Sequence, residues 1–304
     1  MTELFSEPGS LDRLPTEQLN PRTADLDRLD TLGILTRIND EDRLVATAVR
    51  AALPELGRAV DLATARWRAG GRVVLFGAGT SGRLAMLDAA ELGPTFGVPA
   101  DRYLARMAGG TDALRAASEG SEDDWASGEA AAADLTAADV AVGIAASGRT
   151  PWVLGALAAA RRRGAVTIGV ACVLGSELGA YADVTVAVDT GPEPIAGSTR
   201  MKAGTAQKLV LNAFSTALMV RLGKVYGNLM VDVQATNGKL RRRAIRIVQQ
   251  AARVDAATAE GTLTEASFEV KTAIVALRLG IVVPEARARL AQADGAVRQA
   301  LGET

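Results

Sequence analysis

Five short apolar runs constrain the fold of this 304-residue chain most strongly, because a glycine-rich or polar turn and then a helical pattern follow each of them. The runs are Val73–Phe76, Tyr103–Met107, Val140–Ala145, Val166–Ala171 and Val184–Val188. Strands that alternate with helices are typical of a parallel sheet with helices on both faces. The sequence therefore predicts a doubly wound α/β domain with a five-stranded parallel sheet. Its ligands are expected at the carboxyl ends of the strands.

The segment before the first apolar run contains a polar arm and then helices. Residues 1–22 are polar and include three prolines, so we expect a flexible or loosely docked arm. From Thr23 to Arg68 the apolar residues recur at helical spacing. Asn39-Asp40 is a predicted cap between two helices, and Pro54 is the expected start of a third.

The segment after the last apolar run is predicted to be helical. Strand signals stop after Arg200, and Pro284 is expected to begin a late helix. We therefore predict a sheet-containing domain with N-terminal helices over residues 23–222. A C-terminal helical region is expected over residues 223–304.

The composition excludes several classes of active site. The chain has no histidine and one cysteine, so it has no Ser-His-Asp triad, no HExxH or Cys₂His₂ zinc site, and no disulfide or CxxC pair within the chain. If the protein is an enzyme, its proton-transfer groups must be Asp, Glu, Lys, Tyr or that cysteine.

Charge and hydropathy exclude some partners. The net charge of −1 gives no overall field for nucleic acid or a membrane surface. There is no signal-peptide pattern and no apolar stretch of the roughly 20 residues that a spanning helix needs. We expect a cytoplasmic protein without nucleic-acid or membrane partners.

A glycine-rich turn follows the first apolar run. Gly77-Ala78-Gly79-Thr80-Ser81-Gly82-Arg83 matches the dinucleotide fingerprint GxGxxG superficially, but no acidic residue follows at the expected second strand end. The hydroxyls of Thr80 and Ser81, with backbone N–H groups at a helix N-terminus, suit a sugar phosphate. We therefore predict a phosphate site formed by Thr80, Ser81, Gly82 and Arg83. The simpler interpretation is a tight turn capped by Ser81.

A second loop repeats this pattern after the third apolar run. Ser147, Gly148, Arg149 and Thr150 precede Pro151, which is a suitable first residue of a helix. Ordinary capping explains Ser147 or Thr150 alone. Two such loops can converge on one phosphate, so we expect both to bind substrate.

A third loop leads into the helix that begins near Lys202. Glu193 stands between two prolines, and Ser198 and Lys202 follow close to the helix start. We expect a further anion-binding helix N-terminus here, with Glu193, Ser198 and Lys202 as binding residues.

Two acidic positions are candidates for proton transfer. Glu91 lies just before Gly93-Pro94, where its helix is expected to end, and a carboxylate there is unfavourable for the helix dipole. Glu119 and Glu122 belong to an acidic cluster. Local sequence alone favours, for most of this cluster, a solvated first helical turn with Ser121 as its cap.

The segment Gly191–Lys208 resembles the signature of the N-acetylmuramic acid 6-phosphate etherases and the related glucokinase regulatory protein. The regulatory protein resembles two sugar-isomerase (SIS) domains in tandem, and this chain has room for one, so the etherases are the closer match. The resemblance extends over nearly the whole chain after residue 20. Its other blocks are residues 37–42, 75–83, 88–97, 119–123, 143–151 and 224–233.

This resemblance implies a fold, an assembly and a reaction. The fold is an SIS-type α/β sandwich with a C-terminal helical region, and the assembly is a homodimer. The reaction cleaves the D-lactyl ether of N-acetylmuramic acid 6-phosphate to N-acetylglucosamine 6-phosphate and D-lactate, in recycling of cell-wall sugars. The family's two acids fall on Glu91 and Glu122, and its phosphate- and sugar-binding loops on Thr80-Ser81 and Ser147-Gly148-Arg149. Leu92-Gly93-Pro94 stands where Cys-Pro-Pro is expected, which implies a changed loop lining.

The implied chemistry needs no metal and no nicotinamide cofactor. A base removes the C2 proton of the open-chain sugar, an acid protonates the lactate leaving from C3, and water adds to the unsaturated aldehyde. We assign the acid to Glu91 and the base to Glu122 as a hypothesis. Three alternatives stay open: a non-catalytic sugar-phosphate sensor, an SIS-fold sugar-phosphate isomerase, and a dinucleotide-binding oxidoreductase.

Overall fold

The computed structural model describes residues 14–115, 120–235 and 237–303. The chain forms two compact units: residues 1–89 with 101–214, and residues 90–100 with 215–304. Residues 90–100 and the last turns of the helix at residues 202–221 group with the second unit, whereas the predicted domain of residues 23–222 included both.

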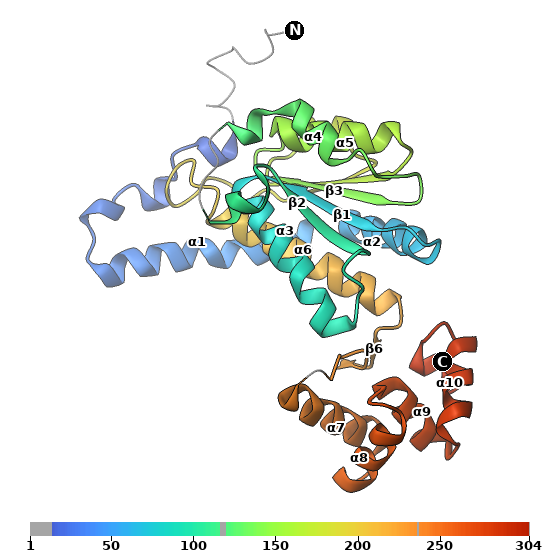
Figure 1. Cartoon of the computed structure of the whole chain (residues 1–304). Coiled ribbons are helices and arrows are strands. Elements are labelled where there is room, and N and C mark those ends of the chain that lie inside the picture. The colour runs from blue at the N-terminus through green and yellow to red at the C-terminus, as the bar shows by residue number, and fades with distance from the viewer. Residues whose placement is uncertain (1–13, 116–119, 236, 304) are drawn as a thin grey trace. The chain divides into compact units, whose positions relative to one another are not determined.

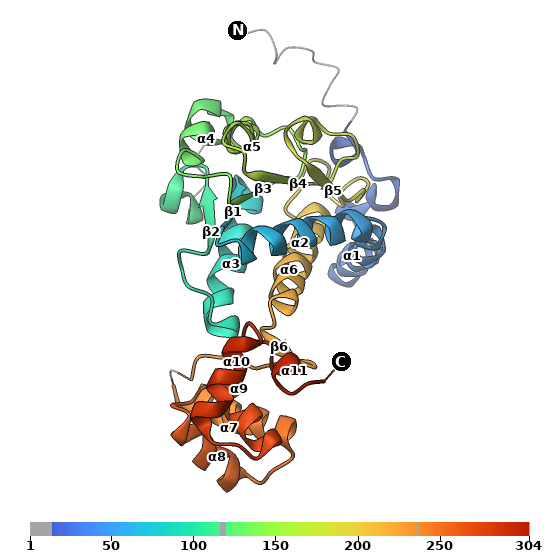
Figure 2. The same ribbon diagram turned by 90° about the vertical axis from the view of Figure 1, so that its right-hand side faces the viewer.

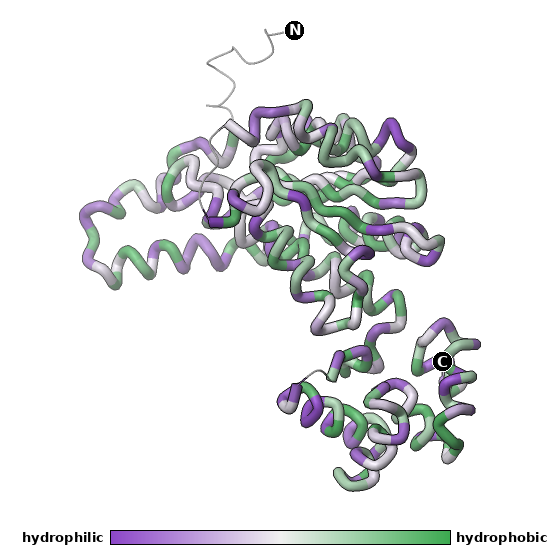
Figure 3. The backbone as a smooth tube through the Cα atoms, viewed as in Figure 1, coloured by the Kyte–Doolittle hydropathy of each residue, from purple (hydrophilic) through white to green (hydrophobic). Residues whose placement is uncertain are grey.

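A five-stranded parallel sheet forms the centre of the first unit, in the order β2-β1-β3-β4-β5. The expected sheet is thus confirmed. All residues of β1, β3 and β4 are buried, which explains why these strands are apolar apart from Thr167 of β4. Figure 3 shows these strands as a band of hydrophobic residues. The strands are β1 (Val73–Gly77), β2 (Tyr103–Met107), β3 (Val140–Ala145), β4 (Val166–Ala171) and β5 (Val184–Ala187).

Helices cover both faces of this sheet. Figures 1 and 2 show α4 (Trp125–Ala131) and α5 (Pro151–Arg162) on one face. The opposite face carries α2 (Leu53–Arg68) and the N-terminal parts of α3 (Gly79–Phe96) and α6 (Lys202–Arg221). Short 3₁₀ helices lie in the connections. They are η4 (Gly110–Leu114), η5 (Ser121–Asp123) and η6 (Glu177–Tyr181).

The described part of the N-terminal arm is docked on the first unit. Thr16 and Asn20 are buried, and the Thr23 hydroxyl donates to the carbonyl of Pro194 at 2.9 Å. The expectation of a flexible or loosely docked arm therefore does not describe residues 14–22, and residues 1–13 lie outside the described residues. The arm contains η1 (Pro15–Glu17) and η2 (Pro21–Thr23), and η3 (Leu26–Arg28) follows.

The first long helix is continuous where the sequence analysis predicted a boundary. Helix α1 (Thr31–Ala51) begins after Asp30, whose side chain accepts a hydrogen bond from the N–H of Gly33. Asn39 and Asp40 lie on its exposed face, where polar residues do not interrupt a helix. The predicted cap at Asn39-Asp40 is therefore wrong, whereas Pro54 does lie in the first turn of α2.

Helix α3 also extends beyond its predicted end at Gly93-Pro94. It continues to Phe96, and the N–H of Gly97 donates to the carbonyl of Gly93 at 2.9 Å. Gly97 has a positive φ of 62°, a conformation common for the glycine that follows a helix. Glu91 therefore lies within the helix and not at its last residue.

The second unit contains a helical region and a small hairpin. The expectation that strands end before Arg200 is wrong for β6 (Val225–Tyr226) and β7 (Leu229–Met230), which pair antiparallel around Gly227-Asn228. No helix of the described residues is long and apolar enough to cross a membrane. The helices are α7 (Gly238–Ala252), α8 (Ala256–Glu265), α9 (Val270–Leu279), α10 (Val283–Gln292) and α11 (Val297–Ala300).

Candidate active site

Two of the predicted loops lie side by side at the carboxyl edge of the sheet. Strands β1 and β3 are parallel neighbours, and Gly77 at the end of β1 pairs in register with Ile144. The loop that starts α3 and the loop that precedes α5 therefore leave the sheet at the same edge. This arrangement places Thr80 and Ser81 in the same region as Ser147 and Thr150, as a shared phosphate site requires.

The first loop turns tightly and packs against α6. A Cβ atom at Gly82 would lie 2.8 Å from the carbonyl oxygen of Gly77, so only glycine fits this close approach of backbone. The Ser81 hydroxyl donates to Gln207 Oε1 of α6 at 2.9 Å. Ser81 is 7% exposed and Gln207 is 1% exposed. The hydroxyl predicted to bind phosphate thus has a buried partner within the protein.

The second loop keeps its hydroxyl groups available. Thr150 precedes α5, but its side chain makes no capping hydrogen bond, so the simpler explanation of a cap does not account for it. The Ser147 hydroxyl accepts a 3.3 Å hydrogen bond from the N–H of Arg149. Gly148 has a φ of 66°, and a Cβ atom there would lie 2.2 Å from Ser176 Oγ. That Ser176 oxygen is buried without a hydrogen-bond partner.

The two arginines of these loops lie in different surroundings. The Arg83 guanidinium donates to the carbonyl of Ala113 at 2.8 Å and to that of Leu114 at 3.3 Å. Arg83 therefore ties α3 to η4. Arg149 is exposed within the second loop.

The third loop directs its charged residues inward. Glu193 is fully buried, and its carboxylate accepts hydrogen bonds from the N–H groups of Lys202 at 2.8 Å and Ala203 at 2.9 Å. Burial raises the pKa of Glu193, while these two N–H groups favour its charged form. The anion at the N-terminus of α6 is thus the chain's own carboxylate. Ser198 is half-buried in the same loop.

Lys202 forms a buried ion pair with a residue that the sequence analysis did not single out. Its ammonium group lies 2.8 Å from Glu41 Oε2 and also donates to the carbonyl of Pro192 at 3.0 Å. Arg22 and Asn20 donate to the same carboxylate. The Arg22 hydrogen bond, followed by those from Lys202 and Asn20, lowers the pKa of Glu41 to about 2.

The two predicted acids are both exposed. Glu122 lies in η5 after Gly120, and Glu91 lies in the part of α3 that groups with the second unit. Asp124 caps α4 by accepting a 3.0 Å hydrogen bond from the N–H of Ser127, so the expectation of Ser121 as the cap is wrong. Glu119 lies outside the described residues.

Three family models match the chain. The glucokinase regulatory protein N-terminal SIS domain matches residues 55–161, and the SIS domain matches residues 126–217. The C-terminal lid domain of glucokinase regulatory protein matches residues 227–273.

Proteins named N-acetylmuramic acid 6-phosphate etherase are similar over nearly the full length. That of Deinococcus radiodurans is 51% identical over 290 residues, which cover 95% of this chain and 95% of the relative. That of Mycolicibacterium smegmatis is 50% identical over 294 residues, which cover 96% of this chain and 99% of the relative. The chain belongs to the N-acetylmuramic acid 6-phosphate etherase family.

A solved structure with a similar fold is that of a phosphoheptose isomerase from Francisella tularensis. It has a TM-score of 0.46 and 19% identity, and the match covers 61% of this chain and 98% of that one.

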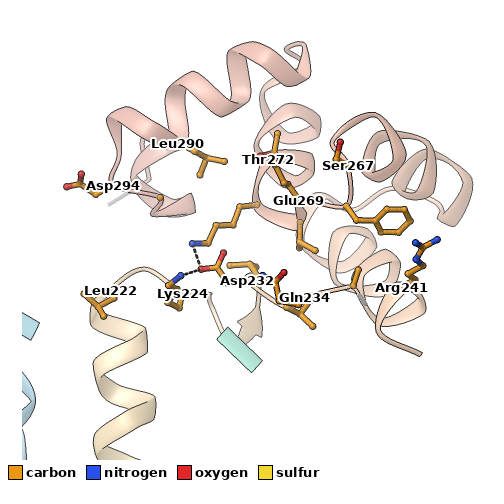
Figure 4. A pocket seen from close by; sticks show the side chains of 17 residues that line it. Leu222, Lys224, Asp232, Gln234, Arg241, Ser267, Glu269, Thr272, Leu290 and Asp294 are labelled. Carbon is orange, nitrogen blue, oxygen red and sulfur yellow. Dashed lines mark hydrogen bonds and ion pairs between the residues drawn. The ribbon is translucent and has the colours of Figure 1, made fainter. Parts of the chain in front are cut away.

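A cavity of about 620 Å³ lies in the second unit of this etherase-family chain. Lys224 and Lys271 both pair with Asp232, and their ammonium groups lie 2.9 Å and 2.7 Å from its Oδ2 atom. Figure 4 shows Lys224 directed at Asp232. Burial lowers the pKa of Lys271. The described residues that line this cavity include none of the predicted site residues.

Sequence reasoning missed Gln207 and Glu41 as parts of the site's framework. Gln207 is a polar side chain within a buried helix face of small and apolar residues, and that interruption is a signal the sequence does carry. Its buried neighbours on α6 are Ala203, Ala206, Val210 and Leu211. Glu41 carries no comparable signal, because its partner Lys202 is 161 residues away.

Proposed function

We propose that this chain is a carbon–oxygen lyase that cleaves the D-lactyl ether of N-acetylmuramic acid 6-phosphate. The products are N-acetylglucosamine 6-phosphate and D-lactate, and the reaction serves amino-sugar catabolism. The observation that carries the proposal is about 50% identity, over nearly the full length, to proteins named for this activity. The two hydroxyl-rich loops at one sheet edge support it, because they suit a sugar phosphate.

The phosphate is proposed to bind between the first and second loops. Thr80, Ser81 and Gly82 supply hydroxyl and backbone donors at the start of α3, and Ser147, Gly148 and Thr150 supply those before α5. The exposed charge of Arg149 adds attraction for the dianion. Arg83 contributes by fixing η4 against α3.

The third loop is proposed to support this site without holding phosphate directly. Glu193 and Lys202 already have buried partners within the protein, so a ligand would have to displace them. Together they fix the start of α6, which packs against the first loop through Gln207. Ser198 is only half-buried and keeps its proposed contact with the sugar.

The two exposed glutamates are proposed as the acid and the base. Glu122 removes the C2 proton, which the C1 aldehyde of the open-chain sugar acidifies. Glu91 protonates the C3 oxygen of the departing lactate, and water then adds at C3. A positioned acid or base of this kind accelerates a step by about 10²–10⁴-fold.

A D-lactate release assay with N-acetylmuramic acid 6-phosphate tests this function. We expect lactate and N-acetylglucosamine 6-phosphate in equal amounts. Binding of the sugar phosphate without lactate would instead favour a sensor, and a ketose product would favour an isomerase. Either result would overturn the proposal.

We further propose that the protein is a homodimer. Leu32 and Leu35 lie one turn apart on α1, which extends away from the sheet, and they are 71% and 58% exposed. Large apolar side chains exposed together favour contact with another protein surface. Light scattering should give twice the chain mass of 31.4 kDa. The Leu32→Glu, Leu35→Glu double variant should be monomeric.

A further inference from the structure

Gln207 has a buried amide group of which one end is hydrogen-bonded and the other is unpaired. Its Oε1 atom accepts from the Ser81 hydroxyl at 2.9 Å, while its Nε2 atom is buried without a partner. A buried N–H donor without an acceptor is unfavourable, and such groups are rare in folded proteins. The location of this one is informative, because its neighbour Ser81 belongs to the proposed phosphate loop.

The surroundings of Gln207 hold it in this position. The start of α6 is fixed by the Glu193 carboxylate and by the buried Lys202–Glu41 ion pair. A Cβ atom at Gly204 would lie 3.4 Å from Thr80 Cγ2, so α6 packs closely on the first loop. The side chain therefore stays against Ser81 whichever end of its amide faces the hydroxyl.

The two orientations of the amide have different consequences for Ser81. With Oε1 towards Ser81, the hydroxyl hydrogen is used inside the protein and Nε2 is unpaired. After a half-turn of the amide, Nε2 donates to Ser81 Oγ, and the hydroxyl hydrogen is free to donate outward. The amide nitrogen carries two hydrogens, so without a ligand two donor hydrogens stay unpaired in either orientation. After the rotation, an anion above the loop accepts from the hydroxyl and leaves only one donor hydrogen unpaired.

We propose that Gln207 is a positioning residue. A half-turn of its amide frees the Ser81 hydroxyl to donate a hydrogen bond to phosphate. Gln207 acts through Ser81 and does not itself touch the ligand. The inference rests on the proposed function in one respect, namely that the ligand of the first loop is a phosphate.

Isothermal titration with inorganic phosphate and with N-acetylglucosamine 6-phosphate tests this role. Gln207→Met keeps the side-chain size but removes both hydrogen-bonding atoms, and Ser81→Ala removes the hydroxyl. Each single variant should weaken binding about tenfold, which corresponds to one charge-assisted hydrogen bond. The double variant should be no weaker than Ser81→Ala alone, because Gln207 has no effect without the hydroxyl. If the losses of affinity in the two single variants multiply in the double variant, the two residues act independently and the proposal is overturned.

A second variant separates positioning from folding. Gln207→Leu also removes both hydrogen-bonding atoms and adds no charge, so it should weaken binding of both phosphates as much as Gln207→Met does. The matched control is Gln250→Leu, the same change on the exposed face of α7, which should leave binding unchanged. Binding of uncharged N-acetylglucosamine should change little in either variant. An equal loss for charged and uncharged ligands would indicate a structural role and overturn the inference.

These measurements are independent of the proposed catalysis. If the wild-type protein releases lactate but Gln207→Met binds phosphate normally, the inference fails and the function stands. If the wild-type protein binds phosphate with the expected coupling but releases no lactate, the function fails and the inference stands.

Discussion

Lys202 and Glu41 form an ion pair that is buried on both sides, with the Nζ and Oε2 atoms 2.8 Å apart and side chains 1% and 2% exposed. The pair connects the first residue of α6 to α1, 161 residues earlier. Because α6 carries Gln207 against the first loop, this contact helps to position that loop.

Removing one member of this pair should destabilise the first unit. Glu41→Gln leaves the Lys202 ammonium buried without its counter-ion, which typically costs about 3–5 kcal/mol. Urea unfolding followed by tryptophan fluorescence measures this, since Trp67, Trp125 and Trp152 all lie in the first unit. The control is Asp40→Asn, whose exposed ion pair with Arg43 contributes no more than about 1 kcal/mol. Equal effects of the two variants would contradict this account.

The same carboxylate makes stability depend on acid pH. The hydrogen bond from Arg22, with those from Lys202 and Asn20, lowers the pKa of Glu41 from 4.5 to about 2 in the folded protein. The folded state thus binds this proton less readily than the unfolded state. The stabilisation is roughly 3 kcal/mol above pH 4.5 and is lost as the pH falls towards about 2.

The comparison of wild type with Glu41→Gln isolates this contribution. The difference between their unfolding free energies should be largest near neutral pH and should shrink as the pH falls below 4.5. A difference that stays constant over this range would show that Glu41 titrates normally in the folded protein.

Gly148 should be required for ligand binding as well as for backbone conformation. In Gly148→Ala the new Cβ atom would lie 2.2 Å from Ser176 Oγ, and the φ of 66° is unfavourable for alanine. Gly175→Ala is a matched control, because its φ is 62° but nothing lies within 4 Å. Both variants should lose about 1–2 kcal/mol of stability from the positive φ.

Only the Gly148 variant should also lose affinity for N-acetylglucosamine 6-phosphate, by about tenfold or more, because the second loop is displaced. Titration calorimetry at one salt concentration measures this. Similar affinities for the two variants would mean that the second loop does not contact the ligand.

The two glutamates should affect turnover far more than binding. Glu91→Gln and Glu122→Gln each remove a titrating group while keeping the side-chain shape. Each should lower kcat for lactate release by about 10²–10⁴-fold and leave product affinity within a few fold. Glu129→Gln, which changes a half-buried carboxylate of α4 that pairs with Arg162, should have no effect on either quantity. Near-normal lactate release by Glu91→Gln would remove its assignment as the acid.

The strands were predictable because buried strands consist mostly of apolar residues, and such runs can be recognised in the sequence. All residues of β1, β3 and β4 are buried, so the three runs are apolar with Thr167 as their one polar residue. The hairpin of β6 and β7 was missed because two-residue strands are too short for a periodic pattern. Its turn residues, Gly227-Asn228, were a signal that could have been used.

The site was predictable in its loops and not in its long-range contacts. Residues that follow a strand meet at one sheet edge, so the first and second loops could be paired from topology alone. Glu193 and Lys202 were expected to bind an anion, and the structure shows that each has a partner in the protein. The partner of Lys202 comes from α1, and no local pattern identifies a contact between positions so far apart in sequence.

The ether is proposed to be cleaved on the sugar side, by elimination and hydration. The most direct measurement is mass spectrometry of the products after incubation of N-acetylmuramic acid 6-phosphate with the protein in H₂¹⁸O. We predict that the heavy oxygen appears at C3 of N-acetylglucosamine 6-phosphate and that the lactate ether oxygen stays unlabelled. Heavy oxygen in the lactate, with none at C3 of the sugar, would contradict this account.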